Sequence, residues 1–81
     1  MITLNTSWIN GNYVIEDCWS VSINSSLSFV CFEALPNSSV NDFTFQGDEA
    51  DDVILQIFDI WNNGDMTQHE AVAQWANMML H

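Results

Sequence analysis

The sequence predicts an α+β fold, in which an antiparallel sheet of about four strands is followed by a C-terminal hairpin of two helices packed on one face. Two observations predict it. Apolar and polar residues alternate through much of the first half of the chain, which is the period of β-strands. From about residue 49 the apolar residues recur every three or four positions, which is typical of amphipathic helices. At 81 residues, the chain is expected to form a single domain, residues 1–81.

The strands are predicted roughly within residues 2–46. An irregular first strand is expected over Ile2–Ile9. Asn10-Gly11 is predicted to form a hairpin turn, because both residues tolerate positive φ, and residues 12–17 would form the returning strand. From Trp19 to Ile23, apolar residues alternate with serines, which predicts a half-buried strand.

The longest predicted strand follows a turn at Asn24–Ser26 and covers Leu27–Leu35. It is apolar on both faces, which indicates either a central strand covered on both sides or a strand with one face left for a partner. Pro36 interrupts the sheet because proline cannot donate to a strand ladder. Alternation around Phe43 and Phe45 then predicts a short last strand.

Two helices are predicted, roughly over residues 49–62 and 67–80. Asp48 is expected to be the N-cap of the first helix, and Asn63-Gly64 its C-terminal cap. Thr67 with Glu70 predicts a capping box at the start of the second helix. The side chains predicted to face the core are Ile54, Ile57, Phe58 and Trp61 in the first helix, and Val72, Trp75 and Met79 in the second.

The charge balance is abnormal, because the chain has 11 acidic residues, no Lys and no Arg, and a net charge of −11. A domain of this size ordinarily contains about nine or ten basic residues. Without cations the chain cannot displace phosphate counterions, which excludes nucleic acid as a direct partner and disfavours anionic membranes. A basic protein surface is the natural complement, and long-range attraction would speed that encounter.

Most of the acidic residues lie in one part of the chain, between Asp42 and Glu70. On the first predicted helix, a polar stripe of Asp52, Gln56, Asp59 and Asn63 runs opposite the apolar face. The residues predicted to contact a partner are Asp42, Asp48, Glu49, Asp51, Asp52, Asp59 and Asp65. Eleven carboxylates on a globule about 30 Å wide approach the ~18 phosphate charges of duplex DNA of that length, so partial imitation of a phosphate track is feasible.

In its size, its lack of Lys and Arg and the acidic helix between Gly47 and Asp65, the chain resembles the small acidic proteins that phages and mobile elements use against host defences. Anti-CRISPR proteins and DNA-mimic inhibitors of restriction enzymes belong to that class. The resemblance implies an inhibitor that occupies a basic nucleic-acid channel on a larger protein, such as a CRISPR effector or a restriction enzyme.

One alternative is a structural or assembly protein of a virus, which would interact through the apolar strand Leu27–Leu35. A small monomer would fit the inhibitor, and a large symmetric assembly would fit the alternative. The sequence is also compatible with a homodimer.

A second alternative is a calcium-binding helical hairpin, because residues 59–70 have the spacing of an EF-hand loop. The oxygen-bearing candidates are Asp59, Asn63, Asp65, Thr67 and Glu70. Gly64 stands at the required sixth position, but Trp61 occupies the third, where an oxygen ligand is needed. The capping signals explain the same residues, so we expect neither a metal nor another cofactor.

No nucleophile triad or phosphate loop accompanies the paired carboxylates, so we do not expect an enzyme. Cys18 and Cys31 lack the number and spacing of a disulfide scaffold or a zinc site, and we expect free thiols. The first eight residues have neither the basic nor the apolar region of a signal peptide, and no apolar run is long enough to span a bilayer. We therefore expect a cytoplasmic protein, in the host cytoplasm if it is viral.

Overall fold

A computed structural model describes residues 9–80 of the protein. In this range the chain forms four β-strands, then two α-helices, with a short 3-10 helix after the second strand. The strands are β1 (Asn10–Ile15), β2 (Trp19–Asn24), β3 (Phe29–Ala34) and β4 (Phe43–Gln46). The helices are η1 (Ser25–Leu27), α1 (Asp48–Asn63) and α2 (Gln68–Met79). The predicted α+β fold is confirmed.

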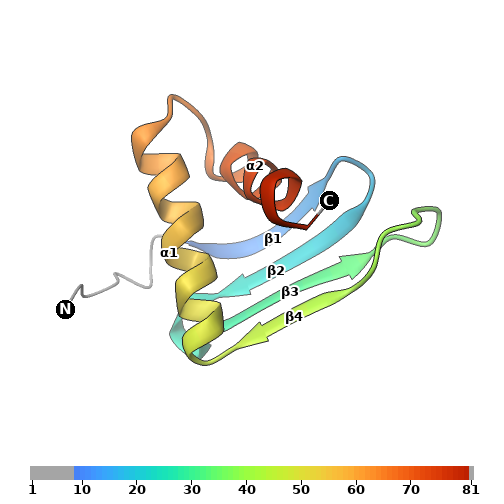
Figure 1. Ribbon diagram of the computed structural model, residues 1–81, viewed down its shortest axis with the longest axis horizontal. Coiled ribbons are helices and arrows are strands. Elements are labelled where there is room, and N and C mark those ends of the chain that lie inside the picture. Colours follow the sequence, from blue (N-terminus) through green and yellow to red (C-terminus); the bar gives the residue numbers. More distant parts are fainter. Residues whose placement is uncertain (1–8, 81) are drawn as a thin grey trace.

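The strands form an antiparallel meander in the order β1-β2-β3-β4, so every strand pairs with its neighbour in the sequence. Both α-helices pack against the same face of the sheet (Figure 1). α1 follows directly from β4, and α2 returns over β1. The helices therefore cover one face, and the other is the open face of the sheet.

Alternation along the strands sorts their side chains between these two faces. Val30 and Phe32 of β3 are buried beneath the helices, whereas Phe29 and Cys31 are half-buried on the open face. The central row of the open face is Asn12, Ser22, Cys31 and Thr44. Of the two interpretations of the apolar strand, the structure therefore supports the one with one face left uncovered by the described residues.

Asn10-Gly11 does not form the first hairpin turn, contrary to prediction. Both residues lie inside β1, paired with Asn24 and Ile23 of β2. The predicted strand Ile2–Ile9 lies outside the described residues, apart from Ile9, which is buried and precedes β1.

The chain reverses instead at Glu16 and Asp17, which have φ values of 52° and 54°. The amide of Cys18 donates to the carbonyl of Ile15 at 2.9 Å and closes the turn. Two successive positive φ values are typical of the type I′ turn, which usually contains Asn and Gly. Asp tolerates positive φ but Glu rarely adopts it, so Glu16-Asp17 is a weaker turn signal than Asn10-Gly11.

The start of α1 also differs from the prediction, because Gly47 rather than Asp48 is the N-cap. Gly47 has φ 61° and ψ −135°, a conformation that glycine adopts without steric cost, and it makes no side-chain cap. Asp48 is instead the first helical residue, where the helix dipole favours its carboxylate.

The other predicted helix ends are confirmed. The amide of Gly64 donates to Ile60 and ends α1. At the start of α2, the amide of Glu70 donates to Thr67 Oγ1 at 3.1 Å, and the amide of Thr67 donates to Glu70 Oε1 at 3.1 Å. The capping box thus satisfies two amides that the helix itself cannot.

The core lies between the sheet and the helices. Its largest fully buried side chains are Trp19, Phe32, Ile9, Ile15, Ile54, Ile57, Val21, Val30 and Val72. Phe58 and Trp61, which were predicted to face the core, are only partly buried and pack at its edge. Met79 is wrongly predicted: it is 56% exposed, because the buried stripe of α2 ends at Ala76, one turn earlier.

Polar contacts and a ring contact join α2 to β1. The hydroxyl of Tyr13 donates to Gln68 Oε1 at 3.2 Å, and the ring of Tyr13 stacks on that of His69 with centroids 6.1 Å apart. His69 Nε2 lies 2.8 Å from the carbonyl oxygen of Val14. These contacts place Tyr13 partly beneath α2.

Burial raises the pKa of the Tyr13 hydroxyl above its ordinary value of 10.0. Because Tyr13 is the chain's single tyrosine, tyrosinate absorbance reports this group alone. We expect a higher titration midpoint in the folded protein than in urea. The unfolded state then loses its proton first, so the free energy of unfolding should fall as pH rises above 10.0. Tyr13→Phe provides the absorbance blank, and equal midpoints in the two states would contradict the burial of Tyr13 beneath α2.

Candidate protein-binding surface

Helix α1 places several carboxylates on one exposed face. An α-helix turns about 100° per residue, so Asp48, Asp52 and Asp59 project within roughly 40° of one another. All three are exposed, as is the neighbouring Glu49. These four residues are called the α1 acidic face below. The predicted polar stripe, Asp52, Gln56, Asp59 and Asn63, is exposed along its full length.

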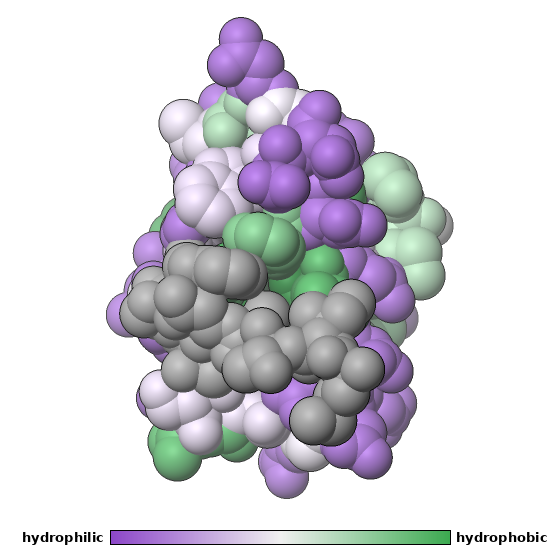
Figure 2. Space-filling view, turned by 90° about the vertical axis from the view of Figure 1, so that its left-hand side faces the viewer, coloured by the Kyte–Doolittle hydropathy of each residue, from purple (hydrophilic) through white to green (hydrophobic). Residues whose placement is uncertain are grey.

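The opposite side of α1 faces the core through Ala50, Val53, Ile54 and Ile57. The helix is therefore held by its apolar side, and Asp48, Asp52 and Asp59 project from the side opposite the buried residues. In Figure 1, α1 lies at the left of the molecule. Figure 2 views the molecule from that side, where hydrophilic residues dominate and apolar residues show between them.

Three other residues predicted to bind a partner are placed differently. Asp51 is half-buried at the edge of α1, where Ser28 Oγ donates to its Oδ1 at 2.7 Å. Asp42 Oδ1 accepts from the amide of Ala34 at 2.7 Å and holds the connection between β3 and β4. Asp65 is exposed in the connection between α1 and α2. The structure thus brings four of the seven predicted residues together on the α1 acidic face.

The residues with EF-hand spacing form two helix ends. α1 continues through Asn63, so Asp59 and Asn63 are both helical, and Asn63 Nδ2 donates to the Asp59 carbonyl at 2.9 Å. The Glu70 carboxylate is engaged with Thr67 in the capping box. Between residues 9 and 80, no group of three or more His, Cys, Asp or Glu side chains is placed to hold a metal ion.

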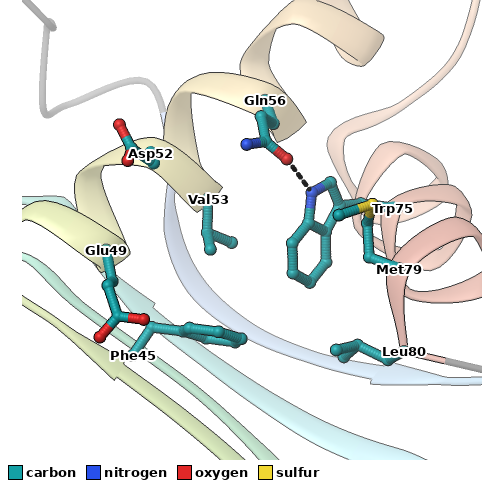
Figure 3. Close-up of a pocket in the computed structure, with 8 residues that line it drawn as sticks. All are labelled: Phe45, Glu49, Asp52, Val53, Gln56, Trp75, Met79 and Leu80. Atoms are coloured by element: carbon teal, nitrogen blue, oxygen red, sulfur yellow. Dashed lines mark hydrogen bonds between the residues drawn. The ribbon is translucent and has the colours of Figure 1, made fainter.

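Two shallow hollows lie where α1 and α2 approach each other, beside the α1 acidic face. The first hollow, of about 270 Å³, is shown in Figure 3; it is lined by Phe45, Glu49, Asp52, Val53, Gln56, Trp75, Met79 and Leu80. The second hollow, of about 370 Å³, is lined by Gln56, Asp59, Ile60, Asn63, Trp75, Met78 and Met79. They adjoin where Trp75 Nε1 donates to Gln56 Oε1 at 2.9 Å (Figure 3).

The hollows combine acidic and apolar walls. Carboxylates come from α1, whereas α2 contributes Met78 and Met79, which are 61% and 56% exposed. Sequence reasoning missed this surface because it assigned Met79 to the core. The run Met78-Met79-Leu80 is a signal that could have found it. Successive helical residues point in directions about 100° apart, so three apolar residues in a row cannot all face the core.

The open face of the sheet is the other candidate contact surface. Leu27, in the turn before β3, is 74% exposed, and Val14 is exposed on β1. Around Val14 the open face is largely polar, and Ser22 Oγ donates to Asn12 Oδ1 at 3.0 Å. Both cysteines are free thiols: Cys18 lies in the turn after β1, and Cys31 lies on the open face.

None of the helices within residues 9–80 is both long enough and apolar enough to cross a membrane. Comparison of the chain with protein-family models, with curated protein sequences and with solved structures finds no significant match.

Proposed function

We propose that this protein binds a basic, nucleic-acid-binding surface on a larger protein and keeps nucleic acid away from it. The observation that supports the proposal is the α1 acidic face in a chain without Lys or Arg. A solvated helix face ordinarily alternates acidic and basic residues, which stabilise each other. Here no basic side chain competes with a partner's cations, and the mutual repulsion of the carboxylates favours a partner that neutralises them.

The mean spacing of the carboxylates is close to that of the phosphates along one strand of a nucleic acid. From Asp48 to Asp59, α1 rises about 16 Å, and the four carboxylates of the α1 acidic face lie in that interval. This amounts on average to roughly one charge per 4 Å, compared with ~3.4 Å per phosphate along one strand of DNA and about half of that distance in a duplex. The proposed imitation is therefore of a single phosphate track.

The resemblance to small acidic anti-defence proteins extends the proposal to a target class. CRISPR effectors and restriction enzymes hold nucleic acid in channels lined by Lys and Arg, and such a channel is complementary to the α1 acidic face. We propose that the protein acts on an enzyme of this kind in the host cytoplasm.

Viral assembly through the apolar segment Leu27–Leu35 is the alternative, and the 74% exposure of Leu27 is the observation that favours it. The core-facing residues Val30 and Phe32 are unavailable to a partner, and the open face of the sheet is mostly polar. Light scattering distinguishes the two functions. A monomer of about 9.2 kDa supports the inhibitor, and a large symmetric assembly supports the alternative.

The proposal predicts that the double variant Asp52→Asn/Asp59→Asn associates with its target several-fold more slowly, with little change in dissociation rate. Long-range attraction acts on encounter, so the association rate carries the effect. The assay is inhibition of DNA cleavage by a panel of purified CRISPR effector complexes and restriction enzymes at low and high salt. Stopped-flow binding to the inhibited enzyme then gives the rates, and added DNA should compete.

The matched control is Asp17→Asn/Glu33→Gln, which also removes two charges but lies on the β1–β2 turn and on β3. It should associate faster than the α1 variant. Equal rates for the two variants, or no inhibition of any enzyme in the panel, would count against the proposal.

A further inference from the structure

We propose that the two hollows beside the α1 acidic face receive apolar side chains from a cationic amphipathic helix of the partner protein. The inference rests on the proposed function in taking the partner to be basic. It adds the shape of the partner's contact element and a second source of binding free energy, the burial of apolar surface.

The spacing of the hollows matches a helix. The α1 residues that line the first hollow are Glu49, Asp52, Val53 and Gln56. Those that line the second are Gln56, Asp59, Ile60 and Asn63. The second set is the first set shifted by seven residues, so the hollows lie about 10.5 Å apart along α1. Side chains at positions i and i+7 of a partner helix are separated by the same distance and lie on one face.

The α2 wall supplies the apolar contact. Met79 lines both hollows beside Trp75, so a partner side chain at i+3 or i+4 would lie over it. Methionine has a flexible, polarisable side chain that adapts to different apolar partners. Met78 and Met79 are the large apolar side chains that α2 leaves exposed. Covering them removes apolar surface from water, which stabilises a complex.

Charge complementarity determines which kind of helix fits. Glu49 and Asp52 flank the first hollow, and Asp59 flanks the second, all on the α1 side. A helix whose apolar stripe enters the hollows would place its flanking residues beside these carboxylates. Lys or Arg there would form ion pairs, and acidic residues would be repelled. A neutral or acidic apolar helix is therefore a poor occupant.

Three synthetic peptides of about 14 residues, the length that spans the two hollows, test the proposal. The first has leucines at i, i+3, i+4 and i+7 and lysines elsewhere. The second has the same composition in alternating order, and the third is oligolysine of equal charge. We expect the first to bind the full chain at least tenfold more tightly than the other two.

Methionine methyl NMR locates the contact, since the chain has four methionines. The methyl signals of Met78 and Met79 should shift when the first peptide is added. The signal of Met66, which is half-buried in the connection between α1 and α2, should not shift. The double variant Met78→Gln/Met79→Gln should bind the first peptide about tenfold more weakly, because it removes apolar surface from the contact. Its affinity for oligolysine should be unchanged. Gln keeps the side-chain length and the helix propensity, so α2 should remain intact. Leu27→Gln removes an even more exposed apolar side chain outside the hollows. It should change neither the affinity for the first peptide nor that for oligolysine.

The outcomes separate the two proposals. Equal binding of the amphipathic and alternating peptides, or an equal loss in Leu27→Gln, would overturn the helix site and leave the α1 acidic face intact. The helix site would also be overturned if oligolysine bound the chain and the first peptide did not. If Asp52→Asn/Asp59→Asn binds oligolysine as well as the parent chain does, the proposed function itself fails.

Discussion

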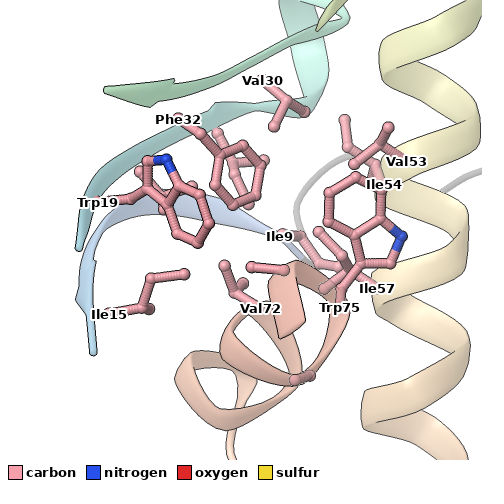
Figure 4. Packing of buried hydrophobic residues seen from close by; sticks show 14 of the residues in the cluster. Ile9, Ile15, Trp19, Val30, Phe32, Val53, Ile54, Ile57, Val72 and Trp75 are labelled. Atoms are coloured by element: carbon pink, nitrogen blue, oxygen red, sulfur yellow. The ribbon is translucent and has the colours of Figure 1, made fainter. Parts of the chain in front are cut away.

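Replacing Phe32 with alanine is expected to lower the free energy of unfolding by about 3–5 kcal/mol. Phe32 is completely buried and lies at the centre of an aromatic cluster, with Trp19, Trp75 and Val72 nearby (Figure 4). Its ring centroid lies 5.6 Å from that of Trp75 and 5.9 Å from that of Trp19. Truncation removes these contacts and leaves a cavity that rigid neighbours cannot fill. The loss is a large fraction of the stability of so small a domain.

Urea denaturation followed by circular dichroism measures the effect. Phe29→Ala is the matched control, because it removes the same side chain from the same strand on the open face, where Phe29 is only half-buried. Its cost should be much smaller. Equal losses for the two variants would contradict the assignment of the faces of the sheet.

Adding sodium chloride is expected to raise the melting temperature by about 5 °C or more between 0.01 M and 1 M. In most proteins salt screens both attractive and repulsive pairs. This chain has 11 acidic residues and no Lys or Arg, so screening mainly removes repulsion. The molecule measures 40 × 28 × 19 Å. The screening length falls from about 30 Å to about 3 Å over this range, so charges that interact across the whole molecule at low salt become independent.

Differential scanning calorimetry measures the shift, and a neutral osmolyte at equal osmolarity controls for general solvent effects. Asp52→Asn/Asp59→Asn should melt higher at low salt and respond less to added salt. A melting temperature that falls as salt is added would show that attractive pairs dominate, contrary to this charge balance.

Side-chain periodicity predicted most of the fold, because burial of one face directly selects the period of a strand or helix. Trp19, Val21 and Ile23 all face the core as expected. The first hairpin turn was assigned to Asn10-Gly11 because Glu16-Asp17, where the chain reverses, is a weaker turn signal. Local preference for a turn at Asn10-Gly11 is overridden by pairing of β1 with β2, which buries Ile15 against the core.

The candidate surface was predictable only in part. Helical spacing was enough to place Asp52 and Asp59 on one exposed face, since that depends on α1 alone. The hollows depend on where α2 crosses α1, and in particular on the contact between Trp75 and Gln56. No pattern within either helix encodes that crossing point. The run Met78-Met79-Leu80 indicates that some of these side chains are exposed, but it does not show that they lie beside α1.

The order of elements also governs how the protein folds during its synthesis. Each strand pairs with the previous one, so the sheet can assemble as it leaves the ribosome. The contacts that join α2 to β1 and to the turn after it form last, since Gln68 and Asn77 bind residues 55 and 61 positions earlier in the chain. Until α2 emerges, the apolar face of the sheet is incompletely covered, a state in which chains tend to aggregate. The carboxylates of α1 emerge first, and their repulsion would keep neighbouring unfinished chains apart.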